Sequence, residues 1–136
     1  MVALGFVVAR FNRPVTERME EAARGAAAER GATVVETTHV PGTYDTPLAA
    51  DRLARREDVD AVVVVGAIIE GDTDHDEIIG HAVAEGLTEV SLDRDTPVTL
   101  GVTGPGMTAA EARDRIERGA GAVESAIDLV EGTPQP

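Results

Sequence analysis

Four stretches of the chain are almost continuously apolar or β-branched, and each has the length of a β-strand. They are residues 2–9, 33–38, 61–69 and 97–102. Unbroken apolar runs of this kind are typical of parallel strands that are covered on both faces. The pattern therefore predicts four buried parallel strands.

A helical pattern follows the first of these stretches. Asn12 is a candidate N-cap, Pro14 falls in a first turn where its missing N–H costs little, and Gly31 is a typical helix stop. Between them, one helical stripe carries Val15, Met19, Ala22, Ala23, Ala26 and Ala27. This spacing predicts an amphipathic helix with one apolar side.

Two more helices are predicted before the last strand. One covers residues 43–56, with its arginines facing outward. Another covers residues 73–84, begins with a Thr73-x-x-Asp76 capping box and ends at Gly86. In the first of these two helices, the residues expected to face inward are Leu48, Ala49 and Leu53.

The C-terminal part predicts one long helix over residues 108–130, or two helices joined near Gly119–Gly121. Its apolar stripe consists of Val123, Ala126, Ile127 and Val130. Residues 132–136 have the composition of a disordered tail, which leaves residues 1–131 as a single domain.

Alternating strands and helices indicate an α/β fold. We expect a three-layer, doubly wound, flavodoxin-like domain, whose four-stranded parallel sheet has the order 2-1-3-4 and helices on both faces. In such sheets, ligands bind outside the carboxyl ends of the strands. The segments at those ends are ARFN, VPGTYD, GAIIEGDTDH and LGVTGPGMT.

The charge of the chain excludes one class of partner. There are 25 acidic and 12 basic residues, a formal net charge of −13, and every basic residue is an arginine. Such a surface repels phosphate backbones, so we expect no nucleic-acid partner. An acidic, lysine-free and aromatic-poor composition is typical of proteins from salt-loving cells, where high salt screens the repulsion between like charges.

No segment predicts a membrane protein or an exported one. The longest apolar run, residues 61–69, is far shorter than the roughly twenty residues of a membrane helix. The first strand follows Met1 without a basic region or a cleavage signature. We therefore expect a cytoplasmic protein with no membrane partner.

The five acids of residues 70–77 form no recognised metal motif. Their alternation suggests a calcium loop, but Glu77 and Val83 stand where such a loop needs a glycine and its last carboxylate. A zinc helix of the His-Glu-x-x-His type would need a second histidine four residues after His75, where the chain has Ile79. Cysteine is absent, so we expect no metal site.

Two interpretations of this acidic cluster stay open. Acids in the first turn of a helix face its partial positive charge, which accounts for Asp74, Asp76 and Glu77 without any function. Alternatively, the turn at residues 71–73 binds an anion through backbone N–H groups, and His75 moves protons near neutral pH.

The four loops, in this order and spacing, resemble the lumazine synthase family. The matching segments are ARFN, VPGTYDTPLAA, GAIIEGDTDHDE and PVTLGVTGPGMT, and the resemblance covers residues 4–130. It implies the condensation of 5-amino-6-(D-ribitylamino)pyrimidinedione with 3,4-dihydroxy-2-butanone 4-phosphate to 6,7-dimethyl-8-ribityllumazine in riboflavin biosynthesis. It also implies that no cofactor or metal is needed.

The resemblance implies that Phe11 stacks on the pyrimidine and that residues 43–45 hold the ribityl chain. The full set for this substrate is Phe11, Thr43, Tyr44, Asp45, Ala67, Ile68, Ile69 and Leu100, with Leu100 reaching into a neighbouring subunit's site. Without a function, Phe11 would be a core aromatic and Thr43 a helix cap. Ile68 and Ile69 would equally suit a core strand.

For the second substrate, the resemblance implies that Asp72 and Thr73 bind the phosphate and that His75 transfers protons. Arg115 of a neighbouring subunit would also grip the phosphate, for which the forked guanidinium is suited. Two nearby arginines leave that choice open: Arg113 and Arg118.

Four positions depart from the commoner bacterial pattern. Leu100 stands in place of a phenylalanine, Glu70 of an arginine, Asp45 of a glutamate and Tyr44 of a phenylalanine. The archaeal branch of the family shows changes of this kind. With a leucine at position 100, one aromatic residue instead of two would contact the ring, which affects affinity more than activity.

The resemblance further implies a homopentamer with sites between subunits, and such pentamers can assemble into 60-subunit capsids. The lack of an insertion near Gly119–Gly121 favours a capsid. One alternative is a relative of the archaeal-type riboflavin synthase, which shares the VPG loop but lacks the GDTxH and TGPGMT segments. The other is a non-catalytic, shell-forming or flavin-binding protein of the same fold.

Overall fold

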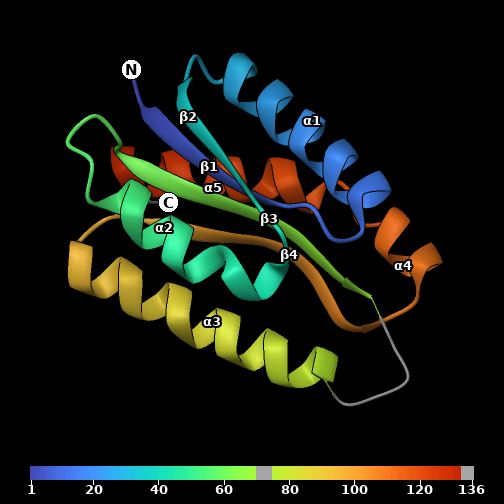
Figure 1. The fold of residues 1–136 in the computed structure, drawn as a ribbon. Helices are drawn as coiled ribbons and strands as arrows, with labels where there is room; N and C mark the ends of the chain where they lie inside the picture. Colours follow the sequence, from blue (N-terminus) through green and yellow to red (C-terminus); the bar gives the residue numbers. More distant parts are fainter. Residues whose placement is uncertain (70–74, 133–136) are drawn as a thin grey trace.

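The four apolar stretches pair into one parallel sheet with helices on both faces (Figure 1). The computed structural model describes residues 1–69 and 75–132. The strands lie in the order β2-β1-β3-β4, which confirms the predicted fold class and strand order. Their bounds are β1 Ala3–Ala9, β2 Thr33–Val40, β3 Ala61–Ile69 and β4 Val98–Met107. The rest of the predicted tail, residues 133–136, lies outside the described residues.

Two long helices cover one face of the sheet, and a shorter and a longer helix cover the other. Helices α1 and α5 lie on one face, and α2 and α3 lie on the opposite face (Figure 1). The bounds are α1 Arg13–Glu29, α2 Thr46–Ala54, α3 His75–Arg94, α4 Ala109–Arg113 and α5 Arg118–Glu131, with a 3-10 turn, η1, at Thr43–Asp45. None of the described helices is long and apolar enough to cross a membrane.

The central strands contribute side chains to two separate hydrophobic cores, because successive residues of a strand point to opposite faces of the sheet. In β3, Val63 and Val65 enter the core under α1 and α5, whereas Val62 and Val64 enter the core under α2 and α3. All four side chains are fully buried. A strand with two buried faces needs no polar residue, which explains the unbroken apolar run.

Helix α3 is longer than its sequence pattern predicted. It continues through Gly86 to Arg94, although we expected it to end at Gly86. Val83 and Leu87 are buried, and a Cβ at position 86 would lie 3.2 Å from the side chain of Pro47. Gly86 therefore lets α3 pack closely on α2, and this packing outweighs the cost of about 1 kcal/mol of a glycine inside a helix.

The prediction for Leu48 was wrong. Its side chain is 57% exposed on α2. The buried face of this helix is formed by Ala49, Ala50 and Leu53. Neighbouring residues of an α-helix differ by about 100° in direction, so a face centred between positions 49 and 53 turns position 48 to its edge.

The C-terminal pattern forms two helices, which was one of the two alternatives. However, α4 and α5 are joined by residues 114–117, and Gly119 lies inside α5. A Cβ at position 119 would overlap the carbonyl oxygen of Met19 in α1. This glycine therefore permits the close crossing of α5 over α1 and does not separate two helices.

Strand β4 is longer than predicted, because its last residues continue to pair with β3. Met107 pairs with Ile69, five residues beyond the predicted end. Gly104 has a φ of 89°, and a Cβ there would overlap the carbonyl oxygen of Ile68. The TGPGM segment, predicted as a loop, thus forms the end of the strand.

Candidate functional site

A hollow of about 240 Å³ opens at the carboxyl ends of β1, β2 and β3, where the sequence predicted a ligand site. The η1 turn and the first turn of α3 form its sides. Seven predicted site residues line it: Phe11, Thr43, Tyr44, Ala67, Ile68, Ile69 and His75. The fold therefore brings residues of three separate loops together around one cavity, which we call the Phe11 hollow.

Aromatic side chains gather at the mouth of the Phe11 hollow. The chain has two phenylalanines, one tyrosine and no tryptophan. Phe6 is fully buried in the core, but Phe11 is 71% exposed and Tyr44 is 64% exposed. An exposed aromatic ring beside an apolar cavity is suited to stack on a flat ligand. The interpretation of Phe11 as a core residue was therefore wrong.

The η1 turn lies close to β3 where Thr43 faces Gly66. Thr43 is buried, and its carbonyl accepts a hydrogen bond from the Thr46 hydroxyl at 2.7 Å. A Cβ at position 66 would lie 2.9 Å from Oγ1 and 3.2 Å from Cγ2 of Thr43. Glycine in β3 thus makes room for the η1 turn to approach the strand.

The loop between β1 and α1 is fastened to both neighbouring strands. The N–H of Phe11 donates to the carbonyl of Pro41 at 2.9 Å, next to the end of β2. The carboxamide of Asn12 donates to the carbonyl of Ala67 in β3, also at 2.9 Å. Asn12 stands at the N-cap position of α1, but its side chain makes no capping hydrogen bond. The sequence predicted the position of this residue and missed its partner.

The first turn of α3 supplies the polar side of the Phe11 hollow. His75 begins the helix, and its neighbours in the lining are Asp76 and Ile79. The predicted phosphate-binding residues Asp72 and Thr73 lie outside the described residues. Among the described residues, no group of three or more histidine or carboxylate side chains could hold a metal ion.

Three predicted residues lie away from this hollow. The carboxylate of Asp45 accepts a hydrogen bond from the N–H of Gly42 at 3.0 Å and lines a neighbouring hollow beside Leu48. Leu100 is 46% exposed on β4 and lines a third hollow, of about 430 Å³, together with Arg118. Arg115 lies in the turn between α4 and α5. In a single chain, Leu100 and Arg115 therefore do not line the Phe11 hollow.

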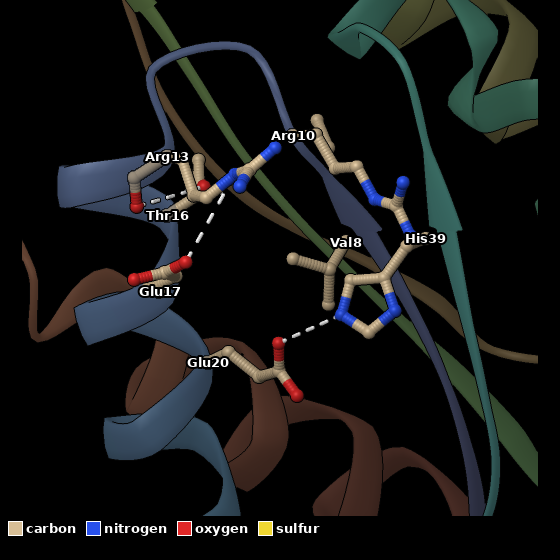
Figure 2. A pocket seen from close by; sticks show the side chains of 8 residues that line it. Val8, Arg10, Arg13, Thr16, Glu17, Glu20 and His39 are labelled. Carbon is tan, nitrogen blue, oxygen red and sulfur yellow. Dashed lines mark hydrogen bonds and ion pairs between the residues drawn. The ribbon is translucent and has the colours of Figure 1, made fainter.

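A fourth hollow, of about 340 Å³, lies between α1 and the edge strand β2 (Figure 2). Its lining is polar and contains both arginine and glutamate side chains: Nε2 of His39 lies 3.1 Å from Glu20, and Nε of Arg13 lies 3.9 Å from Glu17 (Figure 2). Glu17 and Glu20 weaken the attraction of this hollow for an anion, and polar walls do not suit a flat apolar ring. The smaller Phe11 hollow is the better ligand site, although this one is larger.

The ion pairs that shift pKa values lie away from the Phe11 hollow and tie elements together. The Arg94 guanidinium donates to the carboxylate of Asp51 at 2.8 Å and lowers the pKa of that group. This pair joins the end of α3 to α2. Similarly, the Arg56 guanidinium lowers the pKa of Asp58 and also contacts Glu36 of β2.

Comparisons with known proteins find relatives that cover nearly the whole chain. Residues 1–133 match the family model of 6,7-dimethyl-8-ribityllumazine synthase. The chain is 67% identical over 131 residues to the 6,7-dimethyl-8-ribityllumazine synthase of Halobacterium salinarum (strain ATCC 700922 / JCM 11081 / NRC-1), covering 96% of this chain and 98% of the relative. With the same coverage, it is 68% identical to the protein of that name from Halorubrum lacusprofundi. It is 49% identical to the one from Methanocaldococcus jannaschii, over 96% of this chain and 92% of the relative.

Proposed function

The chain belongs to the 6,7-dimethyl-8-ribityllumazine synthase family, and on this premise we propose how its residues carry out the lumazine synthase reaction of riboflavin biosynthesis. The enzyme is a transferase that condenses 5-amino-6-(D-ribitylamino)pyrimidinedione with 3,4-dihydroxy-2-butanone 4-phosphate. The observation that carries the assignment of the site is the apolar Phe11 hollow at the carboxyl ends of the strands, with His75 at its edge.

The pyrimidine ring stacks on Phe11 and lies over the strip formed by residues 67–69. Three features support this pose: the ring of Phe11 is exposed, the strip is apolar, and both line the same cavity. The main chain of that strip offers donors and acceptors to the edge of the ring. The ribityl hydroxyls extend along Thr43 and Tyr44 out of the Phe11 hollow toward the carboxylate of Asp45, the last residue of the η1 turn.

The butanone phosphate occupies the side of the hollow where α3 begins. Asp72 and Thr73 hold its phosphate through backbone N–H groups and the threonine hydroxyl. His75 transfers protons during imine formation, phosphate loss and ring closure. General acid–base catalysis of this kind contributes about 10²–10⁴-fold, and holding two substrates together supplies much of the remaining acceleration.

A second subunit completes the site. Leu100 and Arg115 do not line the Phe11 hollow of their own chain, so they reach a site only if another copy contributes them. This supports sites that are shared between subunits. The family resemblance implies that the assembly is a homopentamer, which could further assemble into a 60-subunit capsid. Arg118, which lines the same hollow as Leu100, is the alternative phosphate ligand. We propose that the assembly works in a salt-rich cytoplasm.

The test is to mix the purified protein with both substrates in molar salt and to follow the absorbance and fluorescence of the lumazine. We expect product only when both substrates are present, and slower product formation with His75→Ala. Light scattering on the same sample gives the assembly state. A fully assembled protein that forms no lumazine above the uncatalysed rate would be a shell or binding protein, and an active monomer would contradict the shared site.

A further inference from the structure

We propose that Asn12 is a positioning residue of the synthase site, because its carboxamide fixes the ring-stacking residue Phe11 relative to the floor formed by β3. This inference rests on the proposed function, since it assigns Asn12 a part in binding the pyrimidine ring. Asn12 also lines the Phe11 hollow, but the part assigned to it is to hold Phe11 in place.

The Asn12 side chain extends the hydrogen bonding of the sheet beyond the end of β1. The pairing of β1 with β3 ends at Val8 and Val65. Two residues further along β3, the carbonyl of Ala67 has no β1 partner left, and the carboxamide of Asn12 donates to it at 2.9 Å. Ala67 is only 2% exposed, so water cannot easily replace this donor.

The backbone of Asn12 is in a conformation that few residues adopt. Its φ is 67° and its ψ is 40°, in the left-handed region that asparagine tolerates better than most side chains. Two non-glycine residues have a positive φ in the described part of the chain, Asn12 and Asp95. This sharp turn lets the side chain of Asn12 reach β3 while the preceding residue faces the mouth of the hollow.

The position of Phe11 depends on this anchoring. Its ring is 71% exposed, so packing of the side chain itself does little to hold it. Its main chain is held on one side by Pro41 at the end of β2 and on the other by Asn12 bonded to Ala67. The gap between the ring of Phe11 and the strip at residues 67–69 is therefore set by two hydrogen bonds. Loss of the second bond lets that gap vary before the pyrimidine arrives.

Two variants separate the carboxamide from the backbone turn. Asn12→Gly keeps the left-handed conformation at no steric cost and removes the donor. Asn12→Asp is nearly isosteric and tolerates the same conformation, but its carboxylate cannot donate to the Ala67 carbonyl. Asp95→Gly is the matched control, because it relaxes the other positive-φ position, in the turn between α3 and β4, at the opposite end of the sheet from the hollow.

The experiment measures kcat and the KM of each substrate, the melting temperature, and quenching of 6,7-dimethyl-8-ribityllumazine fluorescence on titration with protein. We expect both Asn12 variants to raise the pyrimidine KM and the lumazine Kd about tenfold, as for the loss of one hydrogen bond. The KM of the butanone phosphate should change less than twofold. Asp95→Gly should leave all three constants unchanged.

The outcomes distinguish this inference from the proposed function. A wild-type protein that turns over, with variants that keep its pyrimidine KM and lumazine Kd, overturns the inference alone. Variants with a lower melting temperature and a lower kcat, but with the wild-type KM for both substrates, would show that Asn12 only stabilises the fold. That result also overturns the inference. If Asn12→Gly does not fold, the kinetic constants of Asn12→Asp provide the test. If neither variant folds, Asn12 is needed for folding itself and the inference is overturned. A wild-type protein that neither turns over nor binds the lumazine overturns both.

Discussion

The contact between Gly66 and Thr43 predicts that one added methyl group disturbs both the stability of the protein and its site. In Gly66→Ala, the new Cβ would lie 2.9 Å from Oγ1 and 3.2 Å from Cγ2 of Thr43. Neither side can yield easily, because Gly66 is in the middle of the sheet and Thr43 is buried in the η1 turn. Either the turn moves outward or the strand bends.

Overpacking of this kind costs about 1–3 kcal/mol. For a chain of this length, an unfolding entropy of about 2.1 cal/mol/K per residue converts that cost into a fall in melting temperature of about 3–10 °C. Because the displaced turn carries the proposed ribityl-binding residues, we also expect the pyrimidine KM to rise. The butanone phosphate KM should change little, since its proposed site lies at the start of α3.

The assay combines thermal unfolding with steady-state kinetics and uses two comparisons. Gly25→Ala is the matched control: it is an exposed position inside α1 where nothing among the described residues lies within 4 Å of the new Cβ. It should stabilise the protein by about 1 kcal/mol, because alanine is the better helix former. The double variant Thr43→Ala/Gly66→Ala removes the clashing atoms and should recover about 1 kcal/mol or more relative to additivity. A Gly66→Ala protein that melts at the wild-type temperature with the wild-type pyrimidine KM would show that the contact between Gly66 and Thr43 tolerates a methyl group.

Three further predictions concern the site and its surroundings. His75→Ala should slow turnover by roughly one to three orders of magnitude without abolishing it, and equal damage from His81→Ala in assembled protein would show that the catalytic histidine is misplaced. Arg115→Ala should raise the KM of the butanone phosphate about tenfold or more and leave the pyrimidine KM unchanged, whereas a larger effect of Arg118→Ala would move the phosphate ligand to the hollow beside Leu100. Because Arg94 lowers the pKa of Asp51, the pair stabilises the fold above the unfolded pKa of about 3.9 and loses that contribution as the pH falls through the lower folded pKa. Arg94→Gln should therefore lower the melting temperature at neutral pH and make it fall less steeply below about pH 4, measured by calorimetry at moderate salt.

The fold could be read from the sequence because its main signals are local. The unbroken apolar runs and the helical stripes between them predicted four parallel strands, and the rule for carboxyl ends predicted where the Phe11 hollow lies. The predicted ends of elements are wrong where a contact between residues far apart in the sequence determines the structure. Gly86 does not end α3, because it packs against Pro47, and β4 continues to Met107, because it still pairs with Ile69.

The site likewise has residues that the sequence predicted and one whose contact depends on the assembled sheet. The resemblance to the lumazine synthase family implied roles for Phe11, Thr43 and His75, and all three line the Phe11 hollow. The function of Asn12 could not be read, because an asparagine before a helix usually caps it. Its hydrogen bond to a carbonyl 55 residues away appears only once the strands are assembled. Whether a neighbouring subunit supplies Leu100, as we propose, is likewise decided by the assembly and not by one chain's sequence.

The sparse aromatic content of the chain has a practical consequence for spectroscopy. Tyr44 is its single tyrosine, there is no tryptophan, and this tyrosine is at the mouth of the Phe11 hollow. Near-ultraviolet emission from the protein therefore comes almost entirely from one side chain next to the proposed ligand. A conjugated ring system seated there would quench that emission or receive its energy, so ligand binding can be followed without a label. The same scarcity makes the protein almost transparent in the near ultraviolet, and its concentration has to be measured from the peptide bond or by amino-acid analysis.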